Sequence, residues 1–365
     1  MNKSHHGSKA RSVLTSAGEL KVVRVYFRCV KCQGGGFVAD ERLGIDGRFS
    51  IAVQRLASLA AASWSYDISS QRLAELCGLR ISENTIRDIA QTHGAEMNAW
   101  QNSDPQAARE FRDAQGEAEF TTDGTSVNTT GGWREMKVGV FAKRPEGEPA
   151  TPAEWATRTL PAPVSRVAFA AIERSERFGR RWKAWSRRLG LFDTSRITLL
   201  ADGAKWIWEE KRKHLTQANG VLDIFHNLEH FAAAGRSLYG DGASQAATWL
   251  EKSRQVVLQG DWPAIERHIT TTRESFPDSP EKQQSLDELL NYLLPHTHHM
   301  TYSQRLSQGR SIGSGLIEGA CKNLIGRRLK QTGARWKVRR VNRMAGLCTV
   351  MYSDTWNQYW NSRTT

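Results

Sequence analysis

The sequence predicts a mixed α/β protein with a helical domain in front of the α/β part. Strand-like apolar segments alternate with helical periodicity between about residues 117 and 225. A helix, a glycine turn and a capped helix precede this region, and about eighty residues of helical spacing follow it. We therefore expect a helical domain, an α/β core with flanking helices, and an all-helical insertion, in that order.

Length and charge narrow the classes of function. The chain has 365 residues, enough for two or three domains, and a formal charge of +13. Such a positive balance favours a polyanionic partner such as nucleic acid over a neutral small substrate. The longest apolar stretch, residues 56–64, is shorter than the ~18 residues of a membrane span. Five cysteines do not form a disulfide framework, so we expect a cytoplasmic protein without membrane contact.

Residues 1–46 form a short segment with one strand candidate, Leu20 to Phe27, that runs into Cys29 and Cys32. Two thiolates at this spacing, followed by glycines, make half of a zinc knuckle. The alternative is a turn without metal, because the remaining cysteines fall in other segments. Bound Zn²⁺ at Cys29 and Cys32 is therefore one of two interpretations.

Residues 47–101 are expected to form a helical domain with a helix-turn-helix. Gly78 ends one amphipathic helix, and Ser82 caps the next. This layout would turn Asn84, Thr85 and Arg87 toward a DNA groove. An ordinary helical hairpin has the same pattern, so the motif does not decide between the two.

The α/β region is expected to start near residue 115. The strand candidates are 120–122, 133–142, 167–172, 196–201 and 220–225, and helices are expected at 173–189 and 205–213. Later helices are expected at 228–238, 243–257, 262–271 and 283–294. Strands separated by helices predict a compact α/β domain.

Three carboxylates stand at positions where such a fold can bring them together. Asp123 and Asp202 each precede a glycine after a strand candidate, and Glu318 lies in the first turn of a later helix that Ser314 is expected to cap. Three carboxylates without thiol or imidazole partners suit Mg²⁺ or Mn²⁺. Two such ions ~4 Å apart serve phosphodiester chemistry. The alternatives are structural: Asp123 in a hairpin turn, and Glu318 paired with Lys322.

The helix of Glu318 is expected to continue into a long basic face without another acid. We expect this face to bind the DNA backbone. Its residues are Lys322, Arg327, Arg328, Lys330, Arg335 and Lys337. A basic, solvated helix surface without a ligand is the alternative.

The histidines allow two metal-site interpretations, a zinc-protease motif at 226–230 and a cluster at 296–299, and for each the sequence favours a simpler alternative. His226 and His230 share a helix face, but Glu229 is not placed as a zinc-protease motif requires. His296, His298 and His299 follow Pro295 and are expected to be exposed in a loop.

Four ordered segments also resemble a known family. TTDGTSVNTTGGWREMKVG, LLADGAKWIW, DIFHNLEH and GSGLIEGACKNLIGRRLKQTGARW are similar to blocks of insertion-sequence transposases of the ISKra type, which have an RNase H-like core. The resemblance implies an RNase H-like domain over 115–365 with a helical insertion at about 227–308. It implies a catalytic, metal-binding triad of Asp123, Asp202 and Glu318. Segment 223–226 is similar to a signature of Mutator-like relatives, which places His226 near the scissile phosphate.

The resulting functional expectation is a DNA transposase that cleaves the ends of its element and joins them to target DNA with Mg²⁺ or Mn²⁺. Its expected partners are terminal inverted repeats, target DNA and further copies of itself on DNA, in the cytoplasm at the nucleoid. Two alternatives stay open: a helix-turn-helix regulator without catalysis, and an RNase H-like nuclease without strand transfer.

Overall fold

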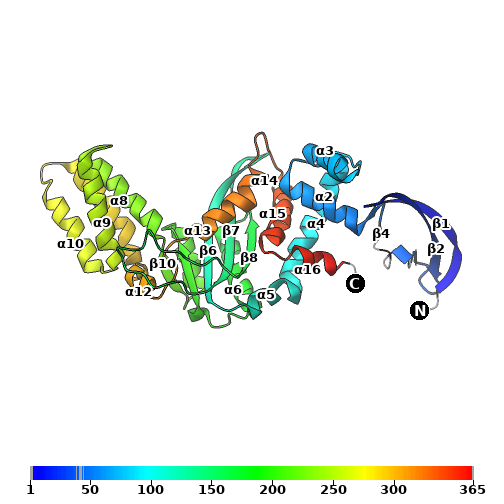
Figure 1. Ribbon diagram of the computed structural model, residues 1–365, viewed down its shortest axis with the longest axis horizontal. Coiled ribbons are helices and arrows are strands. Elements are labelled where there is room, and N and C mark those ends of the chain that lie inside the picture. Colours follow the sequence, from blue (N-terminus) through cyan, green and yellow to red (C-terminus); the bar gives the residue numbers. More distant parts are fainter. Residues whose placement is uncertain (1–2, 38, 41–42, 44, 364–365) are drawn as a thin grey trace. The chain divides into compact units, whose positions relative to one another are not determined.

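A computed structural model describes residues 3–37, 39–40, 43 and 45–363 (Figure 1). The chain is a mixed α/β protein that divides into two compact units. Unit 1 holds residues 1–107, 127–134 and 322–365, and unit 2 holds 108–126 and 135–321. The division differs from the expected boundaries, because the last 44 residues (365 − 321) group with the N-terminal helices and not with the α/β core.

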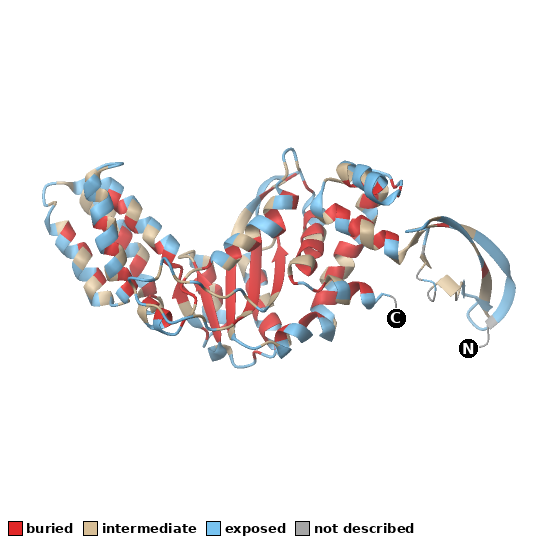
Figure 2. Cartoon of the chain, in the orientation of Figure 1, coloured by how far each residue is buried: buried red, intermediate tan, exposed pale blue. Residues whose placement is uncertain are grey.

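Unit 2 contains a five-stranded sheet in the order β10-β9-β6-β7-β8. Its strands are β6 (Glu117–Thr129), β7 (Gly132–Arg144), β8 (Ser165–Ala171), β9 (Ile197–Ala201) and β10 (Asn219–Leu222). β9 runs parallel to both β6 and β10, while β7 and β8 are antiparallel. The middle of the sheet is almost entirely buried (Figure 2), as expected for strands with near-continuous apolar runs.

Helices cover this sheet and extend beyond it. They are α5 (Arg109–Asp113), α6 (Ser175–Arg188), α7 (Lys205–His214), α8 (Ile224–Tyr239), α9 (Ser244–Gln259), α10 (Trp262–Glu274), α11 (Pro280–Leu293), α12 (Tyr302–Ser307) and α13 (Gly315–Ala320). Trp182 and Trp185 of α6 pack with Phe120, Phe169 and other rings in one aromatic core. α8 to α12 form the helical insertion that the sequence predicts.

Asp123 and Gly124 lie inside β6, not in a hairpin turn. The strand continues to Thr129, and the chain reverses at residues 130–131. A side chain at Gly124 would place its Cβ 2.1 Å from Glu135 Oε1 on the neighbouring strand. A side chain at this position would therefore displace the Glu135 side chain beside Asp123.

Unit 1 combines a second sheet with a helical bundle. Its strands are β1 (Lys3–Thr15), β2 (Gly18–Cys29), β3 (Gly35–Gly36), β4 (Ile45–Asp46) and β5 (Phe49–Ser50), and its helices are α2 (Ile51–Ser63), α3 (Tyr66–Cys77), α4 (Glu83–Ser103), α14 (Arg327–Leu329), α15 (Val338–Tyr352) and α16 (Trp356–Asn361). The long β1–β2 hairpin was not expected, because the polar residues of β1 lack the apolar alternation that marks a strand.

The expected helix-turn-helix elements are present as α3, a turn and α4. Gly78 ends α3 with φ 66°, and the Ser82 hydroxyl accepts a hydrogen bond from the Thr85 N–H at the start of α4. α4 packs closely on α15: a Cβ at Gly94 would lie 2.2 Å from the Arg343 carbonyl oxygen. α15 therefore forms part of the core of this domain.

The helix expected after Glu318 is present but ends at Leu329, so it does not extend along the whole basic segment. α13 ends at Ala320, a π-helical turn spans Cys321–Gly326, and α14 is a single short turn. Ser314 precedes α13, but its side chain makes no capping hydrogen bond. Gly333, with φ 76°, lies in the turn after this helix, so Arg335 and Lys337 are not part of it.

His296 and His299 are packed inside unit 2, contrary to the expectation of an exposed loop. Their Nδ1 atoms are 3.4 Å apart, and the His299 ring stacks on Trp208 with centroids 4.1 Å apart. Burial lowers the pKa of each to about 4, and for His299 the neighbouring His296 lowers the pKa further.

Acid should therefore destabilise unit 2 through these two rings. Because both stay neutral when folded and take up protons when unfolded, their stabilisation is complete above pH ~6.5 and is lost as the pH falls toward 4. We expect the free energy of unfolding to fall by at least about 1 kcal/mol over that range. Denaturant titrations at several pH values measure this free energy. Its dependence on pH should be weaker in the double variant His296→Gln/His299→Gln and unchanged in the control His298→Gln. An unchanged slope in the double variant would contradict this assignment.

Candidate metal and phosphate site

One cavity of unit 2 collects the three acids singled out in the sequence. Its volume is about 490 Å³, and Asp123, Asp202 and Glu318 all line it, together with Asp223 and His226. Asp123 comes from the middle of β6, Asp202 directly follows β9, and Glu318 lies on α13. Because β6 and β9 are parallel neighbours, their two aspartates lie at the same end of the sheet.

The acids differ in their surroundings. Asp123 and Asp202 are half-buried, while Glu318 is exposed. Burial raises the pKa of Asp123, its hydrogen bond from the Gly124 N–H opposes this, and the negative charge of Asp202 raises it further. Two carboxylates therefore repel each other in this cavity, and a cation would relieve that repulsion.

Asp223 joins three parts of the site, a role that was not predicted from the sequence. Its backbone N–H donates to the Ala201 carbonyl, 2.7 Å away, just before Asp202. One carboxylate oxygen accepts from the His226 N–H at 2.8 Å, which caps α8, and the other accepts from the Ser314 N–H before α13. With 2 % of its surface exposed, this side chain positions the segments that carry Asp202, His226 and Glu318.

Two further contacts fix the segment before α13. The Arg305 guanidinium donates to the Ser311 carbonyl oxygen at 2.6 Å and pairs with Glu117 of β6 at 2.9 Å. The Ser311 hydroxyl donates to Glu119, and a Cβ at Gly313 would lie 2.9 Å from the Phe225 ring, which would have to shift. The segment that precedes α13 and Glu318 is thus fixed by contacts with β6 as well as with Asp223.

His226 lies at the exposed start of α8 and contacts Glu229, with Nδ1 and Oε2 3.0 Å apart. Partial burial lowers its pKa, but the Glu229 hydrogen bond and the charges of Asp223, Glu229 and Asp202 outweigh burial, so the pKa is raised. The ring therefore keeps a positive charge to higher pH than a free histidine. An imidazolium at the rim of the cavity would attract a phosphate group.

The donor set fits a hard divalent cation. Asp123, Asp202, Asp223 and Glu318 offer only oxygen ligands, the type that Mg²⁺ and Mn²⁺ prefer. Within the described ranges, no three His, Cys, Asp or Glu side chains stand as a ready set of ligands for one ion. The fit therefore rests on the shared cavity and on the repulsion between Asp123 and Asp202, not on a closed coordination shell.

Cys29 lies at the end of β2, and Cys32 lies in the turn after it. The part of the chain that the structure describes provides no group of three metal-binding side chains there either. Zinc at this turn stays a prediction.

The residues expected to contact DNA fall in unit 1. On α4, Asn84 is exposed and accepts a hydrogen bond from the half-buried Arg87 at 2.7 Å, while Thr85 faces Ser82. Five of the six basic residues after Glu318 are exposed. These are Lys322, Arg327, Lys330, Arg335 and Lys337.

Arg328 does not fit the expected DNA-facing role. It is buried, with 3 % of its surface exposed, and its Nε donates to the Ala61 carbonyl oxygen of α2. Its guanidinium carbon lies 5.0 Å from the Tyr66 ring centre and 5.1 Å from that of Trp336. This side chain stabilises the packing of unit 1 through cation–π contacts, because it lies on a side of its helix that packs against other residues of the unit.

Comparison with known protein families finds none whose profile matches this chain, and comparison with curated proteins finds no match. In the described portion of the chain, no helix has the length and apolar character needed to cross a membrane.

Proposed function

We propose that unit 2 is a metal-dependent phosphodiester-transfer domain of the RNase H-like class. The observation that carries this proposal is the shared cavity: three acids from β6, the end of β9 and α13 line one space. The mixed sheet, with β7 and β8 antiparallel to each other and β9 and β10 parallel, is compatible with such a core.

Within that class, we infer that the protein is a DDE-type DNA transposase. The sequence blocks that resemble ISKra-type transposases contain the cavity residues Asp123, Asp202, His226 and Glu318. The exposed basic residues and the +13 charge suit a DNA partner. Binding to terminal inverted repeats and target DNA, assembly of several copies on DNA, and action at the nucleoid belong to the same proposal.

Each group of the chain has a separate task in this proposal. Asp123, Asp202 and Glu318 would hold Mg²⁺ or Mn²⁺, with two ions as the expected number. When bound, such ions activate a water or 3′-hydroxyl and stabilise the leaving oxygen. His226 would attract the scissile phosphate, and Asp223 keeps the segments of Asp202, His226 and Glu318 in place through its hydrogen bonds.

The test uses the full chain with DNA that carries the ends of its element. With Mn²⁺ or Mg²⁺, the proposal predicts cut ends and products joined to a second DNA. Cutting without joined products would favour the nuclease alternative. Sequence-specific binding without cutting, under either metal, would favour the regulator and contradict the proposed activity.

DNA recognition by unit 1 gives a separate prediction. Arg87→Ala removes a guanidinium at the exposed start of α4, held by Asn84 and by Asp88 at 3.0 Å. If α4 reads the element ends, protection of those ends in footprinting should weaken by roughly tenfold or more. Arg72→Ala on α3 is the matched control, since Arg72 also pairs with a helix neighbour, Glu75. If both variants protect the element ends equally well, Arg87 does not take part in recognising those ends.

A further inference from the structure

A second, larger cavity of unit 2 has no part in the proposed chemistry. Its volume is about 890 Å³. It is lined by Glu117 at the start of β6 and by Thr198 near the start of β9. Asp123 lies further along β6, and Asp202 follows the end of β9. The two cavities therefore lie toward opposite ends of the parallel strands.

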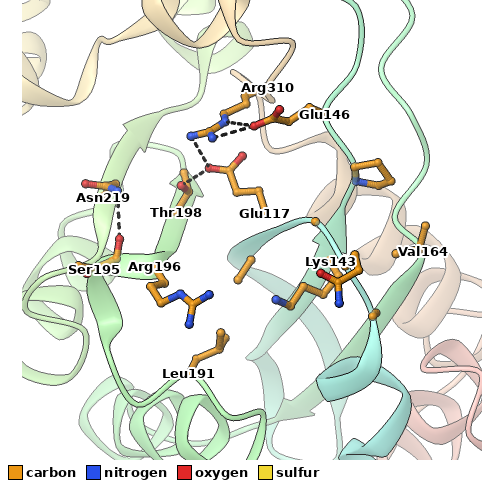
Figure 3. Close-up of a pocket in the computed structure, with 15 residues that line it drawn as sticks. Glu117, Lys143, Glu146, Val164, Leu191, Ser195, Arg196, Thr198, Asn219 and Arg310 are labelled. Carbon is orange, nitrogen blue, oxygen red and sulfur yellow. Dashed lines mark hydrogen bonds and ion pairs between the residues drawn. The ribbon is translucent and has the colours of Figure 1, made fainter.

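Two cations point into this space without an acidic partner. Lys143 and Arg196 extend from opposite walls toward the middle of the cavity (Figure 3). Among the described residues, neither side chain has an ion pair or a side-chain hydrogen bond, although Lys143 lies 5.7 Å from the Phe111 ring centre. Asp193, whose carboxylate Arg196 influences, is exposed, hydrogen-bonded to Ser195 and outside the lining.

The acids that line the cavity are already neutralised. Glu117 pairs with Arg305 at 2.9 Å, and Glu146 pairs with Arg310 at 2.8 Å. Neither carboxylate is therefore available to balance Lys143 and Arg196. Burial lowers the pKa of Lys143, and the charge of Arg196 lowers it further, as expected for two cations that repel each other.

The rest of the lining suits an organic group attached to an anion. Leu191 and Val164 provide apolar surface, and Ser195 and Asn219 provide polar groups on another side. A volume of about 890 Å³ lies within the range of small-molecule sites. Paired Lys and Arg side chains bind phosphate through charge-assisted hydrogen bonds.

We propose that this cavity binds a phosphate monoester of nucleotide size, with Lys143 and Arg196 as the phosphate ligands. A dianion would relieve the repulsion between the two cations, and the nucleoside would lie against Leu191 and Val164. The phosphate could come from a free nucleotide or from the 5′ end of a DNA strand, since the recognition chemistry is the same.

Calorimetry on the full chain tests the proposal with AMP, inorganic phosphate and adenosine as probes. AMP should bind, phosphate should compete with it, and adenosine should bind at least about tenfold more weakly because it lacks the charged group. Lys143→Met and Arg196→Gln should each weaken AMP binding by about tenfold or more, and the double variant should abolish it. Arg267→Gln, which removes an exposed cation of α10 outside the cavity, should bind AMP as the parent does.

Absence of AMP binding at millimolar concentration would overturn the proposal, as would unchanged affinity in a folded double variant or equal affinity for adenosine. Thermal unfolding of each variant checks the fold. Displacement of AMP by a 5′-phosphorylated oligonucleotide, but not by its unphosphorylated form, would assign the site to a DNA end. Binding of AMP that neither oligonucleotide displaces would assign it to a free nucleotide.

Discussion

Neutralising any one of the three cavity acids should reduce metal-dependent DNA cleavage by more than about 100-fold, since loss of a residue that merely supports a metal ligand already costs 10- to 100-fold. The variants are Asp123→Asn, Asp202→Asn and Glu318→Gln. Each keeps the size of the side chain and removes the charge that would hold the cation. Cleavage and joining of labelled element ends, measured at fixed Mn²⁺ concentration, gives the rates.

The matched control is Asp241→Asn. Asp241 is an exposed acid of unit 2 outside the cavity, so its neutralisation changes the net charge equally. The control should cleave at the parental rate. Parental rates in all three cavity variants would show that these acids do not carry the chemistry.

The second large effect is expected at Asp223. Asp223→Asn keeps one acceptor oxygen but turns an amide NH₂ toward the N–H of either His226 or Ser314, leaving a buried donor without an acceptor. Such a loss costs about 1–3 kcal/mol, or roughly 2–12 °C in the melting temperature of a domain of this size. Thermal unfolding measures the loss.

Amide hydrogen exchange separates positioning from general destabilisation. The Ser314 or His226 amide should exchange faster in Asp223→Asn, while amides in the middle of α8 keep most of their protection. Asp193→Asn is the control, because Asp193 also accepts a backbone N–H at 3.0 Å but is exposed. If Asp223→Asn and Asp193→Asn changed the amide exchange rates equally, Asp223 would have no special role in positioning these segments.

Local patterns predicted most elements of unit 2. The strand candidates at 133–142 and 196–201 correspond to β7 and β9, and the helices of the insertion match α8 to α11 within a few residues. These segments have apolar spacing that only one secondary structure satisfies. The candidate acids followed from their positions after those segments.

Other features depend on contacts between residues distant in sequence, which local patterns do not predict. Asp123 and Gly124 look like a turn, yet β6 continues through them to Thr129 and the chain reverses only at residues 130–131. Arg328 looks like a surface cation, yet contacts with Ala61, Tyr66 and Trp336, distant in sequence, bury it. The sequence likewise does not show that Asp223 contacts both His226 and Ser314, because Ser314 lies 91 residues away.

Asp123, Asp202 and Glu318 should together hold a divalent cation. Titration of the full chain with Mn²⁺, followed by electron paramagnetic resonance of the free ion, measures this without DNA or activity. We expect saturable binding that weakens at least tenfold in Asp123→Asn, Asp202→Asn and Glu318→Gln and is unchanged in Asp241→Asn. Mn²⁺ binding of equal strength in all four variants, or no binding by the parent chain, would contradict it.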